Sequence, residues 1–241
     1  MRIAFISDIH GNLHALELVL ADIKGVGVDQ IICLGDIASL GPQPREVIAR
    51  LRELQIPIIM GNHENYLLNP QLTENHHPWL RAAEYWCLTQ LTQGELDFLR
   101  SFPPQLNLTL DHAIPVLCYH ASPRSNEEWI FPTITSEALD EIFAGETAQI
   151  MIGGHTHVQM LRQHKGLLIV NPGSIGMPFE FPMRGQNQHA LRWAEYAILD
   201  RTDGKFTAHL HRLPIDFAEL SKTARASTLP DVEFWLSQWW V

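Results

Sequence analysis

The chain has 241 residues, a formal net charge of −10, and 46% hydrophobic against 18% charged residues. This composition excludes intrinsic disorder and allows one sizeable core, so we expect a single domain over residues 1–241. The acidic balance argues against a protein that grips nucleic acid or a membrane surface by broad electrostatics. It still allows an anionic substrate, because bound metal ions can reverse the field inside a site.

The beginning of the chain does not resemble a signal peptide. Its apolar run, residues 3–6, is short and is followed at once by Asp8 and His10, without a small-residue cleavage site. No stretch approaches the roughly 18 uninterrupted apolar residues of a transmembrane helix. The three cysteines are odd in number and form no Cys-x-x-Cys pair, which favours a reducing compartment. We therefore expect a cytoplasmic protein without a membrane span.

The first half of the sequence alternates between strands and helices. Its short, continuously apolar runs are typical of strands in a sheet that is covered on both faces. The segments between these runs carry apolar residues at helical spacing, and such crossovers favour a mostly parallel arrangement. Strands are predicted at 2–7, 31–34 and 56–60, and helices at 13–23 and 45–54.

Residues 65–104 interrupt this alternation. They include a helical pattern at 82–99, and we interpret the segment as a helical excursion over one end of the sheet. Beyond it, a helix is predicted at 136–143 with Ser136 as its N-cap. Strands are predicted at 106–110, 116–120, 149–152, 160–164, 167–171, 196–200 and 206–213, the last three pairing as a meander. The Trp-rich helix predicted at 231–240 packs on the domain or on a second subunit, which leaves a homodimer possible.

Polar side chains capable of binding metal follow five of the predicted strands. The carboxyl ends of the strands are the edge at which an open α/β sheet collects its ligand site. On extended backbone, the two-residue spacing within Asp8–His10 and within His155–His157 turns both side chains the same way. The residues at these strand ends are Asp8, His10, Asp36, Asn62, His63, His120, His155 and His157.

Each of these short motifs is weak by itself, since a lone Asp-x-His or His-x-His is more often a surface or core pair than a ligand pair. Their combination at successive strand ends indicates a metal site. Oxygen and imidazole ligands without a thiolate suit Mn, Fe, Zn or Ni better than Mg or Ca. Two Asp, one Asn and four His are too many for one ion, but they fit two ions that share a carboxylate.

In chain order, the motifs Asp-x-His, Gly-Asp, Gly-Asn-His-Glu, His and Gly-His-x-His resemble those of the calcineurin-like metallophosphoesterases. The loops at 120–124 and 171–174 resemble the small bacterial and archaeal phosphodiesterase branch of that family. The resemblance extends to about residue 200. It implies an α/β fold of four layers, in which two mixed β-sheets lie face to face and α-helices flank them.

The resemblance also implies roles for the strand-end residues. One metal ion would be held by Asp8, His10 and His157, the other by Asn62, His120 and His155, with Asp36 bridging the two. His63 would lie beside the ions without binding them. Its imidazole is suited to protonate a leaving group, although it could also be a structural residue of the Gly61–Asn62 turn. The expected activity is hydrolysis of a small phosphodiester or nucleotide-type ester by metal-activated hydroxide.

Two further residues are candidates for substrate binding. Asn12 follows the Asp-x-His motif, where it either contacts a phosphate oxygen or holds the loop. Arg124 follows a Ser-Pro turn, where it either binds an anionic substrate or lies on the surface. The sequence leaves both alternatives open for each residue.

A phosphatase, a metal-binding scaffold and a nuclease are the alternatives to a phosphodiesterase. Protein phosphatases of the family carry Asp-Arg-Gly after the Gly-Asp motif, and Ile-Ala-Ser-Leu-Gly at 37–41 replaces it here. This weakens a phosphoprotein phosphatase, while a phosphomonoesterase remains the alternative. A non-catalytic metal-binding scaffold is disfavoured because every motif position is filled. A nuclease would need a basic groove with aromatic side chains, against which the net charge of −10 argues.

Overall fold

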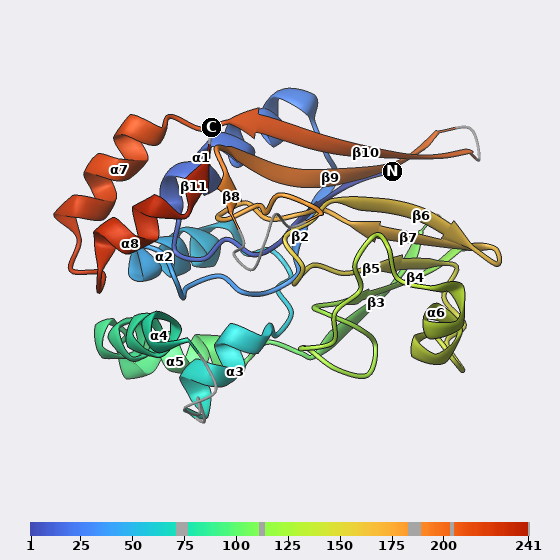
Figure 1. Cartoon of the computed structure of the whole chain (residues 1–241). Helices are drawn as coiled ribbons and strands as arrows, with labels where there is room; N and C mark the ends of the chain where they lie inside the picture. The colour runs from blue at the N-terminus through green and yellow to red at the C-terminus, as the bar shows by residue number, and fades with distance from the viewer. Residues whose placement is uncertain (71–76, 111–113, 183–188, 203–204, 241) are drawn as a thin grey trace.

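The computed structural model describes residues 1–70, 77–110, 114–182, 189–202 and 205–240. Two large mixed sheets lie one above the other (Figure 1). The first has the strand order β10-β9-β1-β2, with β1 (Arg2–Ile6), β2 (Gln30–Cys33), β9 (Trp193–Thr202) and β10 (Lys205–Pro214). The second has the order β3-β4-β5-β7-β6, with β3 (Gln105–Leu110), β4 (Ile114–Tyr119), β5 (Ile150–Ile152), β6 (Met160–His164) and β7 (Leu167–Asn171).

The alternation of side chains along β1 shows how the layers form. Ile3 and Phe5 belong to a core that also contains residues of β4, β5 and β7, so this face of the first sheet packs on the second sheet. Ala4 and Ile6 point the other way, into a core shared with α1 (Leu13–Val26) and α2 (Pro44–Leu54). On the outer face of the second sheet lies α6 (Ser136–Ile142). The four-layer α/β sandwich expected from the sequence is confirmed.

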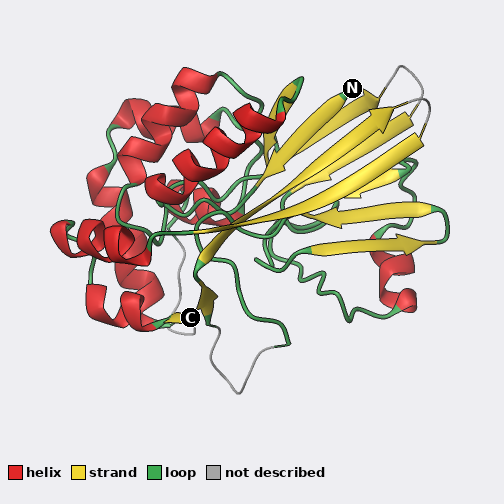
Figure 2. Ribbon diagram, turned by 90° about the horizontal axis from the view of Figure 1, so that it is seen from above, coloured by secondary structure: helices red, strands yellow, loops and turns green. Residues whose placement is uncertain are grey.

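Most of the helices gather at one side of the molecule, beyond the carboxyl ends of β1 and β2 (Figure 2). The helical excursion consists of α3 (Asn62–Leu68), α4 (Pro78–Gln90) and α5 (Gln93–Arg100), and residues 71–76 within it lie outside the described residues. None of the helices in the described part of the chain has the length and hydropathy needed to span a bilayer.

The strand predicted at 56–60 is reduced to one parallel bridge between Cys33 and Ile58. The backbone N–H of Cys33 donates to Pro57, and that of Ile59 donates back to Cys33. The next bond of a parallel ladder would need an N–H at Pro57, which proline lacks. The segment therefore runs beside β2 for a short distance and then leads directly into α3.

The helix predicted at 82–99 is two helices, because the chain is extended at Leu91. Thr92 and Glu95 form a capping box that starts α5, each side chain accepting a hydrogen bond from the other residue's backbone N–H. The predicted cap of α6 is displaced by one residue. The hydroxyl of Thr135, not that of Ser136, accepts the N–H of Ala138.

The predicted meander of three strands is wrong for its first member. β7 pairs with β6 and β5 in the second sheet, whereas β9 and β10 pair with each other and with β1 in the first. Only Lys165 and Gly166 separate β6 from β7, and both have positive φ, which is the geometry of a tight hairpin turn. This short turn fixes the pairing of β7 before the chain crosses to the other sheet.

The C-terminal tail packs on its own domain. It comprises α8 (Val232–Ser237) and β11 (Trp239–Trp240), which pairs in parallel with β8 (Ala190–Leu191). The side chains of Trp235 and Trp239 are buried in the core beside α7 (Phe217–Ala226). The third tryptophan of the tail, Trp240, is 40% exposed and stacks on His189.

Candidate metal centre

The loops that carry the candidate ligands have an unusual backbone. Positive φ angles of 46° to 66° occur at Asp8, His10, Asp36, His155 and His157, so the expectation of extended backbone at the two spaced pairs is wrong. A non-glycine residue in this region costs about 1–2 kcal/mol. Strained residues of this kind persist where surrounding structure enforces them and cluster at functional sites.

Hydrogen bonds between neighbouring loops hold this backbone in place. The N–H of Asp8 donates to Gly35 over 3.1 Å, and that of His10 donates to Asp36 over 3.0 Å. From a third loop, the Ser174 hydroxyl donates to the carbonyl of Asp8 over 2.7 Å. The loops after β1, β2 and β7 therefore fix each other, and the ligand side chains turn toward a common centre.

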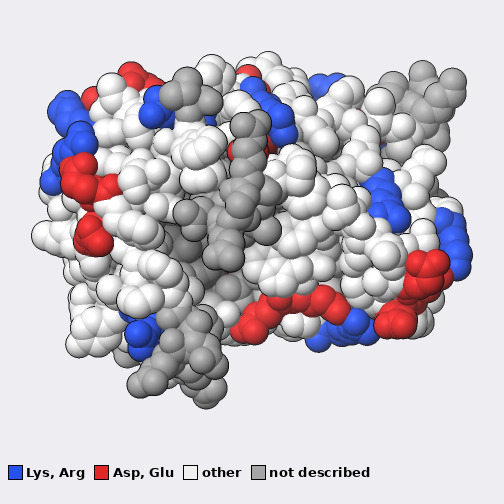
Figure 3. All heavy atoms as spheres, in the orientation of Figure 1, with Lys and Arg blue, Asp and Glu red and all other residues white. Residues whose placement is uncertain are grey.

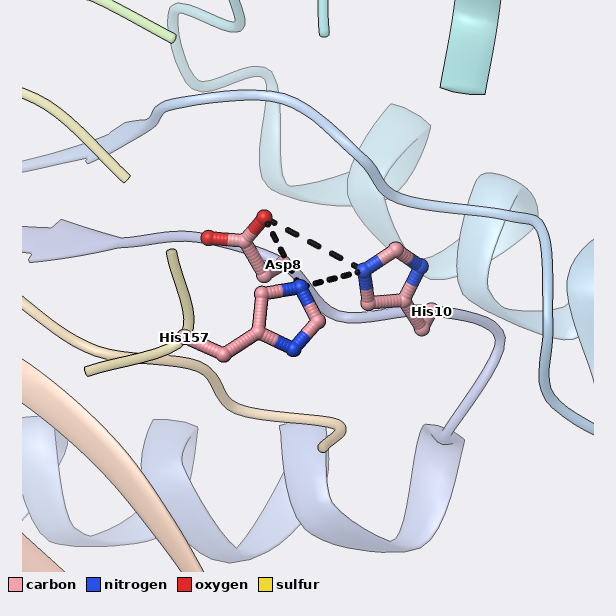
Figure 4. Close-up of side chains that lie close together, drawn as sticks. All are labelled: Asp8, His10 and His157. Atoms are coloured by element: carbon pink, nitrogen blue, oxygen red, sulfur yellow. Dashed lines mark hydrogen bonds and ion pairs between the residues drawn. The ribbon is translucent and has the colours of Figure 1, made fainter. Parts of the chain in front are cut away.

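The first cluster consists of Asp8, His10 and His157, whose side chains point toward one another (Figure 4). The Nε2 atoms of the two histidines lie 3.0 Å apart. Asp8 Oδ1 is 3.4 Å from Nε2 of His157 and 4.0 Å from Nε2 of His10. All three residues are buried.

The outer nitrogen of each histidine is bound to a backbone carbonyl. His10 Nδ1 donates to Ser39 over 3.2 Å, and His157 Nδ1 donates to Met177 over 2.6 Å. In neutral imidazoles, both Nε2 atoms then carry lone pairs that face each other. Burial, with the neighbouring histidines His157 and His63, lowers the pKa of His10 to about 3, which keeps it neutral.

This arrangement fits a cation. Two lone pairs at 3.0 Å repel each other unless a positive charge lies between them, and Asp8 Oδ1 finds no hydrogen-bond donor among the described residues. A divalent metal ion would satisfy all three groups at once.

The second cluster joins Asp36, Asn62, His120 and His155. His120 Nε2 lies 3.1 Å from Asp36 Oδ2 and 2.9 Å from Asn62 Oδ1, and His155 Nδ1 lies 3.0 Å from the same Asn62 oxygen. His120 Nδ1 donates to the Leu34 carbonyl over 2.7 Å, so its Nε2 is again the inward atom. The donor set is two imidazole nitrogens and two oxygens, which suits a transition metal or zinc.

Asp36 lies between the two clusters. Its Oδ2 is 3.1 Å from His120 Nε2, 3.9 Å from His10 Nε2 and 4.0 Å from His63 Nε2. Its Oδ1 accepts the backbone N–H of His63 over 2.9 Å. Burial opposes ionisation, but the surrounding histidines, His120 first, hold the pKa of Asp36 well below its usual range. The structure thus places one ionised carboxylate where both clusters can reach it.

His63 is paired on its far side with Glu84, which the sequence analysis missed. The Nδ1 of His63 is hydrogen-bonded to Glu84, and Ser39 Oγ donates to the same carboxylate over 2.8 Å. Burial lowers the pKa of His63, but Asp36 and Glu84 outweigh this and raise it to about 9. The signal was present in α4, where Glu84 stands beside Ala83 and one turn before Cys87 on the buried face.

Glu64 links the loop after β2 to the residue that precedes α3. Its carboxylate accepts the backbone N–H groups of Asp36, Ile37 and Gly61 over 2.8, 2.8 and 2.9 Å. Burial and the charge of Asp36 raise the pKa of Glu64 to about 7 in spite of these bonds. The glutamate of the Gly-Asn-His-Glu motif therefore supports the backbone that carries Asp36.

Two glycines leave the space that the carboxylates occupy. A Cβ at Gly61 would lie 2.1 Å from Asp36 Oδ1. A Cβ at Gly154 would lie 2.0 Å from Ser7 Oγ and 2.7 Å from Asp8 Oδ2. Any larger residue at either position would therefore displace a candidate ligand.

The two predicted substrate-binding residues make bonds that do not direct their side chains toward the clusters. Asn12 is buried; its Oδ1 accepts the N–H of Ala15 to cap α1, and its Nδ2 donates to Gly176 over 3.2 Å. These bonds favour the loop-holding alternative. Arg124 pairs with Glu128 on the surface, although it lines a cavity of about 430 Å³ that also reaches His120.

Comparison with known proteins agrees with this geometry. Residues 1–203 match the family model of the calcineurin-like phosphoesterase superfamily domain. An uncharacterised protein of Methanocaldococcus jannaschii is 29% identical over 256 aligned residues, which cover 98% of this chain and 96% of that protein. The phosphodiesterase YfcE of Escherichia coli is 26% identical over 214 residues, covering 83% of this chain and 88% of the enzyme.

Solved structures show the same fold. The crystal structure of a metallophosphoesterase from Sphaerobacter thermophilus has a TM-score of 0.76 at 29% identity, covering 99% of this chain and 98% of the other. A hypothetical protein from Pyrococcus horikoshii has a TM-score of 0.81 at 20% identity, covering 98% and 97%. With its buried histidine–carboxylate clusters, the chain therefore belongs to the calcineurin-like phosphoesterase superfamily and is a metal-dependent phosphoesterase.

Proposed function

We propose that the protein is a phosphodiesterase that uses two metal ions. The observation that carries this proposal is the position of Asp36 between two buried clusters, with its Oδ2 3.9 Å from His10 Nε2 of the first and 3.1 Å from His120 Nε2 of the second. One ion would be held by Asp8, His10 and His157, and the other by Asn62, His120 and His155, with Asp36 contacting both. Mn, Fe, Zn and Ni all suit these donors. When bound, two such ions neutralise charge on the phosphoryl group and lower the pKa of the attacking water.

His63 would supply the proton that the departing alkoxide needs. Its Nδ1 is held by Glu84, so the proton would be donated from Nε2, the atom that lies 4.0 Å from Asp36 Oδ2. With Asp36 committed to the ions, the carboxylate of Glu84 would be the group that favours the protonated imidazole. Glu84 would act through His63, by fixing the orientation of the ring and stabilising its positive charge.

A diester is favoured over a monoester as substrate. A monoester carries almost two negative charges near neutral pH, against one for a diester, and needs more cationic groups to bind it. The segment 37–41 lacks the arginine of protein phosphatases, and Arg124 is paired with Glu128. The relative YfcE is itself named a phosphodiesterase.

A small substrate is favoured over polymeric nucleic acid. On the face seen in Figure 3, Lys and Arg stand in small separate groups, with Asp and Glu and uncharged residues between them. Binding of a nucleic-acid backbone needs a continuous basic surface. The proposed substrate is therefore a small phosphodiester.

Elemental analysis and a hydrolysis panel test the proposal. The purified protein is stripped with a chelator, reloaded separately with Mn, Fe, Zn or Ni, and assayed with bis-p-nitrophenyl phosphate and with p-nitrophenyl phosphate. We expect about two ions per chain and hydrolysis of the diester at least as fast as that of the monoester. Strong preference for the monoester would overturn the diesterase, and binding of a single ion would overturn the two-ion centre.

A further inference from the structure

An exposed tryptophan lies directly beside the candidate metal centre. Trp129, in the loop between β4 and α6, is 47% exposed, yet its ring centroid is only 4.6 Å from that of His155, with the rings tilted by 46°. Trp235 and Trp239, by contrast, are buried in the core. Covering the exposed part of this indole with a flat apolar ligand would remove apolar surface from water, which favours binding beside the candidate ligand His155.

Two phenylalanines fix the plane of this indole. Trp129 stacks on Phe131, with ring centroids 5.2 Å apart and planes at 14°, and Phe131 stacks on Phe181, 5.4 Å away and also at 14°. These distances and angles are those of offset stacking. The three rings form an ordered stack that ends, on the side of the metal centre, in a partly open indole.

The loop that carries Trp129 is anchored to the catalytic side of the molecule. Glu127 accepts the hydroxyl of Tyr66 over 3.0 Å, and Tyr66 lies on α3, the helix that begins with Asn62 and His63. One residue after Trp129, Ile130 is buried in the core beneath α6. The indole therefore has a fixed position relative to the residues that would bind and cleave the ester.

We propose that Trp129 is the stacking platform for the nucleobase of a nucleotide phosphodiester. This rests on the proposed function, because the phosphoryl group must be held at the clusters for the base to reach the indole. In a nucleotide, the ribose separates the phosphorus from a flat aromatic ring, and here a flat aromatic ring lies 4.6 Å, centroid to centroid, from His155 of the second cluster. Every base has a π-face, so the platform selects nucleotides over base-free esters without selecting one base strongly.

Stacking of one base on an aromatic side chain strengthens binding by about 5- to 150-fold. The test compares AMP with ribose 5-phosphate, which differ only in the base and resemble the product of diester cleavage. Their dissociation constants are measured by equilibrium dialysis with the Mn-loaded protein, and their inhibition constants with bis-p-nitrophenyl phosphate as the reporter substrate. In the wild type, AMP is expected to bind at least 5-fold more tightly than ribose 5-phosphate.

Variants assign this preference to the indole. In Trp129→Leu the ratio of the two constants is expected to fall close to one, whereas Trp129→Tyr, which keeps an aromatic ring, should retain most of it. Trp240→Leu is the matched control, since it removes another partly exposed tryptophan, one that stacks on His189 in the tail, and should leave the ratio unchanged.

The outcomes separate this inference from the proposed function. Equal constants for AMP and ribose 5-phosphate in an active wild-type enzyme would overturn the platform while the phosphodiesterase stands. Retention of the full ratio in Trp129→Leu would place the base elsewhere. If the wild type binds AMP preferentially but hydrolyses no diester, the platform stands and the proposed function fails. The wild-type ratio alone keeps the inference falsifiable if Trp129→Leu does not fold.

Discussion

Replacing His63 separates proton donation from metal binding. His63 has one nitrogen bonded to Glu84, and its other nitrogen is 4.0 Å from Asp36. If Nε2 protonates the leaving group, His63→Gln should keep both metal ions and the fold but slow the cleavage of alkyl esters. General acid catalysis contributes 10²- to 10⁴-fold, so we expect a loss of this size, equivalent to about 3–5 kcal/mol of transition-state stabilisation.

The leaving group provides the internal standard. A nitrophenolate is a stable anion that departs with little protonation, so its ester should lose far less rate in His63→Gln than a dialkyl ester does. The assay measures kcat for both ester types, for wild type and variant, at one saturating Mn concentration. The decisive quantity is the ratio of the two penalties.

A matched control is available in His164 on β6. This histidine is also buried and also bonded to a carboxylate, Asp140 at 2.9 Å, but it belongs to neither cluster. His164→Gln should leave both rates close to those of the wild type.

Two results would refute the reasoning. Equal penalties on alkyl and nitrophenyl esters would mean that His63 positions the phosphoryl group instead of donating a proton. Loss of a metal ion from His63→Gln would show that His63 binds an ion or supports its ligands, since it lies within reach of His10 and Asp36.

Four further outcomes are expected. Asp36→Asn should lower the occupancy of both metal ions in elemental analysis, because both ions need its charge. His120→Ala should lower mainly the occupancy of one ion. Full occupancy in Asp36→Asn would exclude a shared carboxylate. Gly154→Ala should displace Asp8, lower the free energy of unfolding in urea by about 1–3 kcal/mol and reduce metal occupancy. Gly94→Ala, whose Cβ meets nothing within 4 Å, should lower neither quantity. Burial raises the pKa of Glu195, on β9, from 4.5 to about 7. Between these pH values the folded state keeps a proton that the unfolded state releases. The free energy of unfolding therefore falls by up to about 3 kcal/mol as pH rises through this window. Glu195→Gln should flatten that fall in urea titrations at pH 4.5 and 7.5, and a parallel fall in both proteins would contradict it. Chelation should lower Tm, since ions at 1,000 times their Kd stabilise by about 4 kcal/mol each, and an unchanged Tm would show that metal binding and folding are not coupled.

The candidate ligands could be predicted because each follows the end of a strand or extended segment. Parallel neighbours in a sheet end at the same edge, so the loops after β1 and β2 lie together, as do the loops after β4 and β5. The face-to-face packing of the two sheets then brings residues as distant in sequence as Asp8 and His157 together. The local backbone could not be predicted in the same way. The two-residue spacing assumes extended chain, but the loops after β1 and β2 bond to each other, and these bonds hold Asp8, His10 and Asp36 at positive φ.

Glu84 and Trp129 escaped prediction for a different reason. Each acts through one long-range contact, Glu84 with His63 and Trp129 with His155, and neither contact has a periodic pattern in the sequence. Glu84 at least stands on the buried face of α4, where a carboxylate needs a partner. Trp129 lies in a loop, where an aromatic residue carries no such signal. Contacts between loops and helices depend on the tertiary structure, which periodicity does not encode.

The geometry of the first cluster explains why local strain and metal binding belong together. Turning His10 and His157 inward requires left-handed backbone at both residues and sets their Nε2 atoms 3.0 Å apart. Both features oppose folding in the absence of a cation. A bound cation removes the second, because the lone pairs then become ligands, whereas the backbone strain remains. Backbone bonds and buried supports such as Glu64 hold this arrangement before any ion arrives. The ligands therefore need little reorganisation on binding, so little of the binding free energy of a small, highly charged cation is lost in ordering them.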